Sequence, residues 1–232
     1  MPKRFTRGSG GQIFHVTNRA AMGQVLFDTP DSYLLFLHTL KQACERVPMR
    51  VLAYCLMPNH FHLVLAPIRD GDLSRFMHWL TGTHAKRLRH ATNTVGRGAV
   101  YQGPYRADPV ENEAGLYRLL RYVERNPVRA RLIERAEGWP WSSATLNPVT
   151  RIPLTPWPIP RPKEWLELLA SDDTPYEVDA IRLRIVYRSP VPDDAPVEGI
   201  SPQRPAWFRA AAESDTAPPI NRNAGESAPS GP

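Results

Sequence analysis

The sequence predicts an α+β fold of the ferredoxin-like type, with the element order β-α-β-β-α-β followed by one added helix. Three observations support this prediction: short runs with the pattern of strands, long runs with apolar residues at helical spacing, and a turn that joins the two middle strands. In such a fold the sheet is antiparallel. We expect the helices to cover one face of the sheet and to leave the other face free for a substrate.

The first half of the expected fold consists of a strand, a helix and a hairpin. Residues 13–19 alternate between apolar and polar side chains and predict a strand. Residues 28–31 are a helix start signal, and the leucines that follow at helical spacing extend this helix to about residue 47. Residues 50–56 and 60–66 predict two strands, which the Pro-Asn turn between them joins as an antiparallel hairpin.

The second half begins with a helix that opens at residues 71–72. We expect three of its side chains to line a solvated or DNA-facing surface: His78, His84 and His90. Residues 105–110 predict a short strand, and Asn112 is expected to cap a third helix. The Asn-Pro pair at 126–127 should end or bend that helix, because proline disfavours helical geometry in the preceding residue.

The expected domain organisation has four parts. Residues 1–12 read as a flexible basic leader, and residues 13–147 as one globular domain. Residues 148–188 are a proline-rich spacer with short helices predicted near 163–170 and 177–188, which could serve as a DNA-binding arm. Residues 189–232 combine low hydrophobicity with repeated Pro, Ala, Ser and Asp, so we expect a disordered tail.

The charge is uneven along the chain. Residues 1–150 contain 20 Lys+Arg and 11 Asp+Glu, a net of +9, and the remaining residues contain 9 and 12, a net of −3, which together give the overall +6. Of those 20 basic residues 17 are arginine, whose planar guanidinium binds phosphate and stacks on bases. A GC-rich genome would also explain the excess of arginine over lysine, but it would not explain the net charge. A basic domain of this kind indicates nucleic-acid binding.

The cysteines and the termini bear on the compartment. Cys44 and Cys55 lack the spacing of metal ligands and read as small buried residues in a reducing environment. The N-terminus has no apolar signal region, and no stretch approaches the roughly 20 apolar residues that a membrane span needs. We therefore expect a cytoplasmic protein without membrane contact, associated with the nucleoid when it binds DNA.

Two histidines begin the strand at residues 60–66. Residues i and i+2 of a strand point to the same face, so His60 and His62 project together and Phe61 projects to the opposite face. Neutral imidazole is the commonest protein ligand for metals, which makes this pair half of a divalent-metal site. The alternative is a polar, solvated strand face.

A tyrosine on the third helix is the second candidate for chemistry. Tyr122 lies four residues before Asn126, so both side chains share a helix face. A tyrosine hydroxyl, with a pKa near ~10, is a poor nucleophile at neutral pH and needs an activating site. The alternative is an amphipathic tyrosine that packs its ring and leaves its hydroxyl in water.

Residues from about 10 to 145 resemble the single-tyrosine HUH transposases, and in particular the REP-associated tyrosine transposases of bacteria. The resemblance covers about 60% of the chain, and the matching stretches follow the family's order: 14–19, 53–64, 101–103, 121–123, 126–130 and 139–143. It implies the HUH form of the ferredoxin-like fold, in which the added helix carries the nucleophile.

The resemblance also implies a site and a reaction. His60 and His62 would bind a divalent metal, Mg²⁺ or Mn²⁺, Asn126 would complete the metal site, and Tyr122 would be the nucleophile. The reaction would be nicking and strand transfer on single-stranded or hairpin DNA, such as repetitive extragenic palindromes, through a 5′-phosphotyrosine intermediate. Relatives often act as dimers, so a homodimer stays open.

Further candidates could contact DNA phosphates or could simply be solvated: Arg118, Arg121, Arg125, Arg129 and Arg131. His15 is also a candidate for DNA binding; it could sit beside the metal pair on the same sheet or be an ordinary sheet residue. Two other functions stay open, a domesticated non-catalytic protein that binds DNA hairpins and a hydrolase in which water attacks. In many relatives an Arg-Gly-Arg-Pro-like stretch near the C-terminus assists DNA binding. This chain has Tyr-Arg-Ser-Pro at 187–190, which leaves the role of its C-terminal region open.

Overall fold

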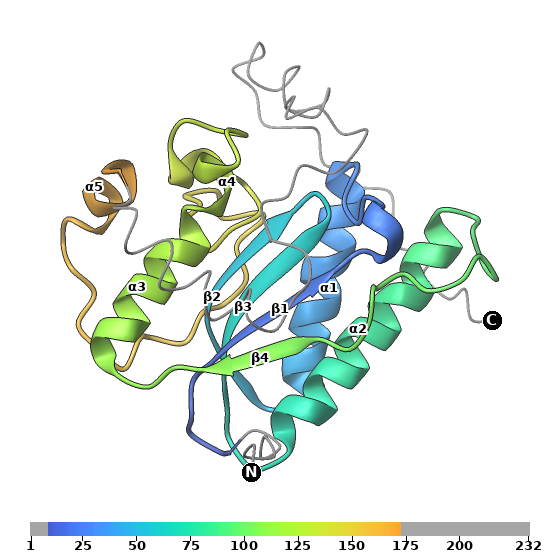
Figure 1. Cartoon of the computed structure of the whole chain (residues 1–232), viewed down its shortest axis with the longest axis horizontal. Coiled ribbons are helices and arrows are strands. Elements are labelled where there is room, and N and C mark those ends of the chain that lie inside the picture. Colours follow the sequence, from blue (N-terminus) through green and yellow to red (C-terminus); the bar gives the residue numbers. More distant parts are fainter. Residues whose placement is uncertain (1–8, 173–232) are drawn as a thin grey trace, which may run out of the picture.

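The structure is a computed structural model that describes residues 9–172 (Figure 1). Its strands are β1 (Phe14–Arg19), β2 (Met49–Met57), β3 (His60–Pro67) and β4 (Arg106–Pro109). Its α-helices are α1 (Pro30–Arg46), α2 (Asp72–Ala91), α3 (Glu113–Glu124), α4 (Asn126–Arg129) and α5 (Trp165–Ala170). Two short 3-10 turns lie at Ala21–Gly23 and Ala136–Gly138. The expected strands and helices up to residue 126 are thus all present, with ends that shift by one or a few residues.

The four strands form one antiparallel sheet in the order β2-β3-β1-β4. This order and the chain order of the elements define the ferredoxin-like topology, so the predicted fold class is confirmed. The histidine-bearing β3 lies in the interior of the sheet, between β2 and β1. In the register, Thr17 of β1 and Cys55 of β2 stand opposite His62. Opposite residues in antiparallel strands share a face.

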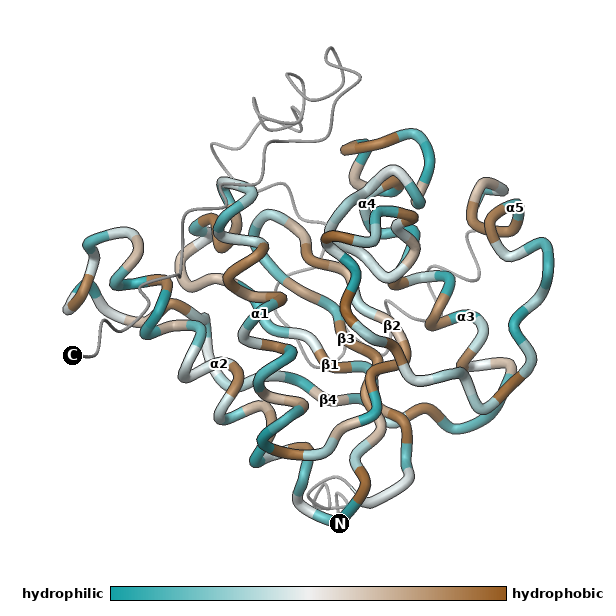
Figure 2. Tube along the Cα trace, turned by 180° about the vertical axis from the view of Figure 1, so that it is seen from behind, coloured by the Kyte–Doolittle hydropathy of each residue, from teal (hydrophilic) through white to brown (hydrophobic). Residues whose placement is uncertain are grey.

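Helices α1 and α2 cover one face of the sheet, as expected (Figure 1). Thr29 caps α1 through a capping box with Ser32, which satisfies backbone N–H groups that the first turn leaves unpaired. The apolar stripe of α1 packs inward, and the ring of Phe36 lies 4.8 Å from that of Phe61 on β3. Figure 2 shows hydrophobic residues along β2 and β3 and at intervals along α1 and α2, which is the pattern of a core between the two layers.

The expectation that three histidines of α2 line a solvated or DNA-facing surface was wrong for His84. His78 and His90 are exposed, but His84 is fully buried. Its ring contacts Phe36 and Phe27, and its Nδ1 lies 2.6 Å from the hydroxyl of Tyr101. His84 therefore belongs to the core between α2 and the sheet.

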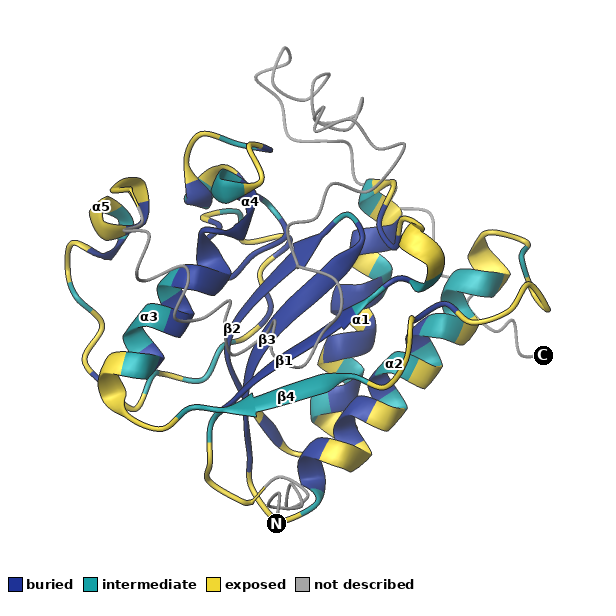
Figure 3. Cartoon of the chain, in the orientation of Figure 1, coloured by how far each residue is buried: buried dark blue, intermediate teal, exposed yellow. Residues whose placement is uncertain are grey.

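The opposite face of the sheet is not free. The expectation that the helices leave this face open to a substrate was therefore wrong. Helix α3 packs against β2 and β3 on this face, and Figure 3 shows β3 and nearly all of β1 and β2 buried. Asn112 caps α3, as predicted, by accepting a hydrogen bond from the backbone of Gly115. The helix ends at Glu124, and the Asn-Pro pair starts the separate turn α4. The added helix thus covers the histidine face.

The segment after residue 147 continues the same packing. Ile152, Ile159, Trp165 and Leu169 are buried within the hydrophobic core, and the indole N–H of Trp157 donates to the carbonyl of Leu52. The domain boundary expected at 147 stays a prediction. Most of the leader, the helix expected at 177–188 and the tail lie outside the described residues. Within residues 9–172, no helix is long and apolar enough to cross a membrane.

Candidate active site

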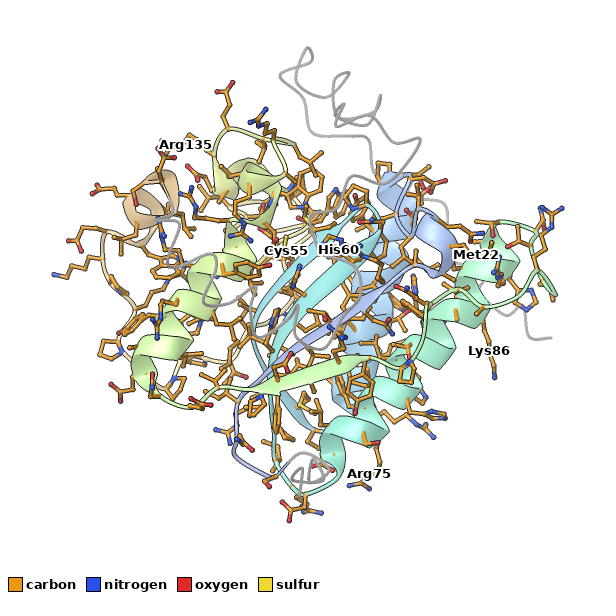
Figure 4. All side chains as sticks on the ribbon, viewed as in Figure 1. Met22, Cys55, His60, Arg75, Lys86 and Arg135 are labelled. Carbon is orange, nitrogen blue, oxygen red and sulfur yellow. The ribbon has the colours of Figure 1, made fainter. Side chains whose placement is uncertain are left out.

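Three histidines from two neighbouring strands meet on the face that α3 covers. His60 and His62 lie on β3 with ring centroids 4.9 Å apart, and His15 of β1 places its Nε2 2.9 Å from Nδ1 of His62. The exposed fractions are 6% for His60, 0% for His62 and 4% for His15. The solvated strand face that the spacing left open is therefore excluded. Figure 4 labels His60, near Cys55, where β2 and β3 approach α4.

Burial keeps these imidazoles neutral. It is the largest of the causes that together lower the pKa of His15 and of His60 to about 3; the charge of Arg129 also contributes for His15, and the charges of Arg19 and Arg129 contribute for His60. The pKa of His62 is well below its usual value for the same first reason, with the other two histidines and two arginines adding to the shift. A neutral imidazole keeps one nitrogen lone pair, which is the form that binds a metal.

The hydrogen bonds of the pair leave particular nitrogen atoms available. Nδ1 of His60 lies 2.7 Å from Oδ1 of Asn59, and Nδ1 of His62 pairs with His15. Nε2 of His62 is buried and has no hydrogen-bond partner in the described structure. A buried polar atom without a partner costs about 1–3 kcal/mol, and the capacity to bind an ion is one of the ordinary reasons for it.

Helix α3 brings Tyr122 onto the histidines. Its apolar residues, Leu116, Leu119, Leu120 and Val123, are buried, and Tyr122 sits at the edge of this stripe with 4% of its surface exposed. The tyrosine ring stands edge-on to His62 and His15, with centroids 5.8 and 6.1 Å apart. The sequence alone could not place this ring, because the contact joins residues from β1, β3 and α3.

Asn126 and Arg129 complete the arrangement. Asn126 Nδ2 donates to the backbone carbonyl of Tyr122 at 3.2 Å, and its Oδ1 accepts from Arg129 at 2.8 Å. Arg129 also donates to the Tyr122 carbonyl, and its guanidinium carbon lies 3.9 Å from the centre of the tyrosine ring, a cation–π contact. The two side chains thus fix the end of α3 beside the histidines.

The donor set fits a divalent cation chemically. The neutral imidazoles of His60 and His62, one with an unpartnered nitrogen, and the amide oxygen of Asn126 are ordinary ligand types. Within residues 9–172, no three side chains drawn from His, Cys, Asp and Glu form a group that could hold a metal. An ion at this place would therefore depend on the two histidines, the amide and solvent or substrate oxygens.

The other four arginines that were predicted to contact DNA lie in different surroundings. Arg121 donates to the carbonyls of Leu168 and Ser171, and the buried Arg125 donates to the carbonyls of Leu169 and Ser171. These two side chains hold α5 rather than face the histidines. Arg118 is half-buried and Arg131 is exposed. A phosphate contact by any of the four stays a prediction.

The sequence reasoning missed the partners of the site residues. Asn59 was noted only as a turn residue, although its place directly before His60 was a signal. Arg129 was named for DNA alone. Its spacing of three from Asn126 and seven from Tyr122 would have placed it on the same helical face. Glu124, buried and bonded to Ser143 and Trp165, had no signal in the sequence.

A ferredoxin-like sheet that presents buried histidines to a tyrosine on an added helix has the architecture expected of a single-tyrosine transposase. The family described as "Transposase IS200 like" matches residues 13–126, a span that ends at Asn126 and contains all four strands. The chain is similar to this family over just under half of its length, and the name of the family implies an enzyme that cleaves and transfers DNA.

Two individual proteins are similar to the chain. A REP-associated tyrosine transposase of Haemophilus influenzae is 26% identical over 132 residues, which are 51% of this chain and 75% of the relative. A solved structure, a REP-associated tyrosine transposase bound to a REP hairpin, aligns with a TM-score of 0.50 and 20% identity, over 62% of this chain and 81% of the other. At that identity the second likeness shows the fold. The expected resemblance to REP-associated tyrosine transposases is confirmed.

Proposed function

We propose that this protein nicks single-stranded, hairpin-containing DNA and transfers the strand through a covalent bond to Tyr122. The observation that carries the proposal is the position of the Tyr122 ring, edge-on to His62 at 5.8 Å with Asn126 one turn further on. A tyrosine buried only for packing would not need three neutral histidines beside it. Burying that many polar groups is costly unless they serve a purpose.

The reaction follows from the groups present. The hydroxyl oxygen of Tyr122 attacks the phosphorus of a DNA phosphodiester and loses its proton, while the bond to the 3′ oxygen breaks and that oxygen takes up a proton. The products are a 5′-phosphotyrosine and a 3′-hydroxyl. A second 3′-hydroxyl can reverse the step, so strand transfer needs no external energy source.

The metal site would belong to the same reaction. His60, His62 and Asn126 would hold a Mg²⁺ or Mn²⁺ ion, which when bound polarises the phosphate that is attacked. The protein's own share is to place the tyrosine and to exclude water. The contacts of Arg129 with Asn126 and with the Tyr122 ring support this role, since they fix the nucleophile relative to the metal ligands.

The substrate class is inferred from accessibility and from likeness. A nucleophile on a buried helix face can reach a backbone only where the strand is unpaired, which points to single strands next to hairpins. The transposase of the similar solved structure was bound to a REP hairpin. The net charge of +9 over residues 1–150 supports binding of a phosphate backbone.

The test is a denaturing gel of the full chain with labelled hairpin DNA in Mg²⁺ or Mn²⁺. We expect a covalent protein–DNA band that disappears in Tyr122→Phe and with a chelator. Tyr117→Phe, on the same helix with its hydroxyl bonded to Pro160, is the matched control and should keep the band. Cleavage that survives in Tyr122→Phe would overturn the proposal and favour attack by water. Hairpin binding without any cleavage would favour the domesticated binding protein.

A further inference from the structure

The two histidines of the pair are held in the same way by different partners. In His60, Nδ1 faces the side-chain oxygen of Asn59 at 2.7 Å. An amide oxygen only accepts hydrogen bonds, so His60 carries its proton on Nδ1 and has its lone pair on Nε2. In His62, Nδ1 is likewise engaged, by Nε2 of His15 at 2.9 Å. Both histidines thus have Nδ1 occupied.

The contact between His15 and His62 has the geometry of an in-plane hydrogen bond. The two ring planes differ by only 10°, and the centroids are 5.2 Å apart while the facing nitrogens are 2.9 Å apart, which is too long a centroid distance for rings that lie face to face. Each nitrogen therefore lies near the plane in which the other ring donates or accepts. Two neutral imidazoles share one proton in such a contact. If His62 donates, its Nε2 is a bare lone pair; if His15 donates, the proton of His62 is on Nε2.

Only one of these two positions of the proton on His62 would let its Nε2 bind an ion. A proton on Nε2 of His62 would be a buried N–H group, and no acceptor faces it in the described structure. A bare Nε2 is also without a partner, but it is ready to bind an ion. It then matches His60, whose Nε2 carries the lone pair because of Asn59. The pair would present two equivalent nitrogens.

We propose that His15 and Asn59 are positioning residues that fix the tautomers of His62 and His60 so that both Nε2 atoms face one metal ion. This inference rests on the proposed function, because it needs the metal site. It assigns His15 to the orientation of a ligand, and removes it from the DNA contacts. His15 is not itself a third ligand through Nε2, since that nitrogen is taken by His62.

The position of His15 argues against a merely structural role. It lies at 4% exposure in the middle of the sheet, in β1, between β3 and β4. An apolar side chain would fill this place without the cost of burying an imidazole. Outer partners that hold the second nitrogen of a metal-binding histidine typically change metal affinity about 10–100-fold when they are removed.

The experiment measures Mn²⁺ binding to the full chain without DNA, by the electron paramagnetic resonance signal of the free ion. His15→Phe keeps a ring but removes the acceptor, and we expect its Mn²⁺ affinity to fall about 10–100-fold. His15→Gln offers an amide oxygen near the same place and should recover most of the affinity. His84→Phe replaces a buried histidine on the other side of the sheet and should leave the affinity unchanged.

An equal Mn²⁺ affinity in His15→Phe and the unaltered chain would overturn the inference. If instead the unaltered chain binds Mn²⁺ no better than His60→Ala, the metal site of the proposed function fails. The two failures are therefore distinguishable. Hairpin binding in the presence of a chelator reports whether each variant is folded.

A second measurement does not depend on any variant. Long-range proton–nitrogen NMR spectra distinguish a protonated from a bare imidazole nitrogen. In the metal-free chain we expect His62 and His60 both to carry the proton on Nδ1. A proton on Nε2 of His62 would contradict the role given to His15, whatever the metal affinity.

Discussion

His84 shows how strongly the interior changes a single histidine in this protein. It has no exposed surface, and the rings of Phe27, Phe36 and Tyr101 surround it. Burial, with a smaller contribution from the charge of Arg87, lowers its pKa to about 3. In the unfolded chain a histidine has a pKa near 6.5. His84 therefore makes folding sensitive to acid.

The direction of this effect follows from proton binding. Between pH 6.5 and 3 the unfolded chain binds a proton at residue 84 and the folded chain does not, so the free energy of unfolding falls as the pH falls. From pH 7 to pH 5 one such histidine removes about 2 kcal/mol. We expect His84→Leu to be less stable at pH 7, because Tyr101 loses a partner, and to lose less stability than the unaltered chain on going to pH 5.

Urea unfolding at the two pH values measures this difference. His38→Leu is the control for replacing a histidine by leucine, because His38 is exposed on α1. The account of His84 fails if His84→Leu loses as much stability between pH 7 and pH 5 as the unaltered chain.

At the scale of elements, α3 is held from the side away from the histidines. Glu124, two residues after Tyr122, accepts hydrogen bonds from the hydroxyl of Ser143 at 2.6 Å and from the indole of Trp165 at 2.7 Å. Arg121 and Arg125 donate to carbonyls at the end of α5. The helix that carries the tyrosine is thus fixed by segments that follow it in the chain.

Removing this connection should weaken the fold measurably. Glu124→Ala leaves the buried indole N–H of Trp165 and the hydroxyl of Ser143 without this acceptor, and we expect the free energy of unfolding to fall by about 1–3 kcal/mol. Glu113→Ala, in the exposed first turn of α3, should cost less than about 1 kcal/mol. Denaturant unfolding of both variants makes the comparison. Equal losses would mean that the contacts of Glu124 do not hold the helix.

The elements differ in how much of them the sequence determines. The hairpin of β2 and β3 was predictable because a period of two and a turn are local signals, and the capping of α3 by Asn112 is local too. The burial of His84 was predictable in principle, since it lies four residues from both Leu80 and Leu88 on the apolar stripe of α2. The environment of Glu124 was not, because its partners are 19 and 41 residues away.

Local sequence patterns likewise predict one part of the candidate site and not the other. The shared face of His60 and His62 follows from strand geometry, and that of Tyr122 and Asn126 from helix geometry. Neither pattern brings the two pairs together. Their meeting depends on the packing of α3 on β2 and β3, which only the resemblance to a family could suggest in advance. The contact of His15 with His62 depends on the register of β1 against β3.

At the scale of the whole molecule, the region shared with the family is shorter than the region that packs together. The match ends at residue 126, and the domain was expected to end at 147. However, the buried core includes Ile152, Ile159, Trp165 and Leu169. The proline-rich context hid Ile152 and Ile159, because prolines interrupt the periodic patterns that reveal helices and strands. The helix that contains Trp165 and Leu169 was expected near 163–170, but its packing into the core was not.

This difference predicts the outcome of truncation. A fragment of residues 1–147 lacks four buried apolar side chains, each worth about 1.5–3 kcal/mol of burial, and leaves Glu124 without Trp165. That loss is comparable with the total stability of about 5–15 kcal/mol of an ordinary domain. We expect this fragment to lose its cooperative thermal transition, followed by circular dichroism, and to form no covalent adduct with hairpin DNA.

A fragment of residues 1–172 keeps every contact described between residues 9 and 172 and should retain a cooperative transition. A fragment 1–147 that unfolds at the same midpoint as fragment 1–172 would place the boundary at 147 and make the later segment an accessory, so the two fragments decide whether the tyrosine helix needs the chain that follows it.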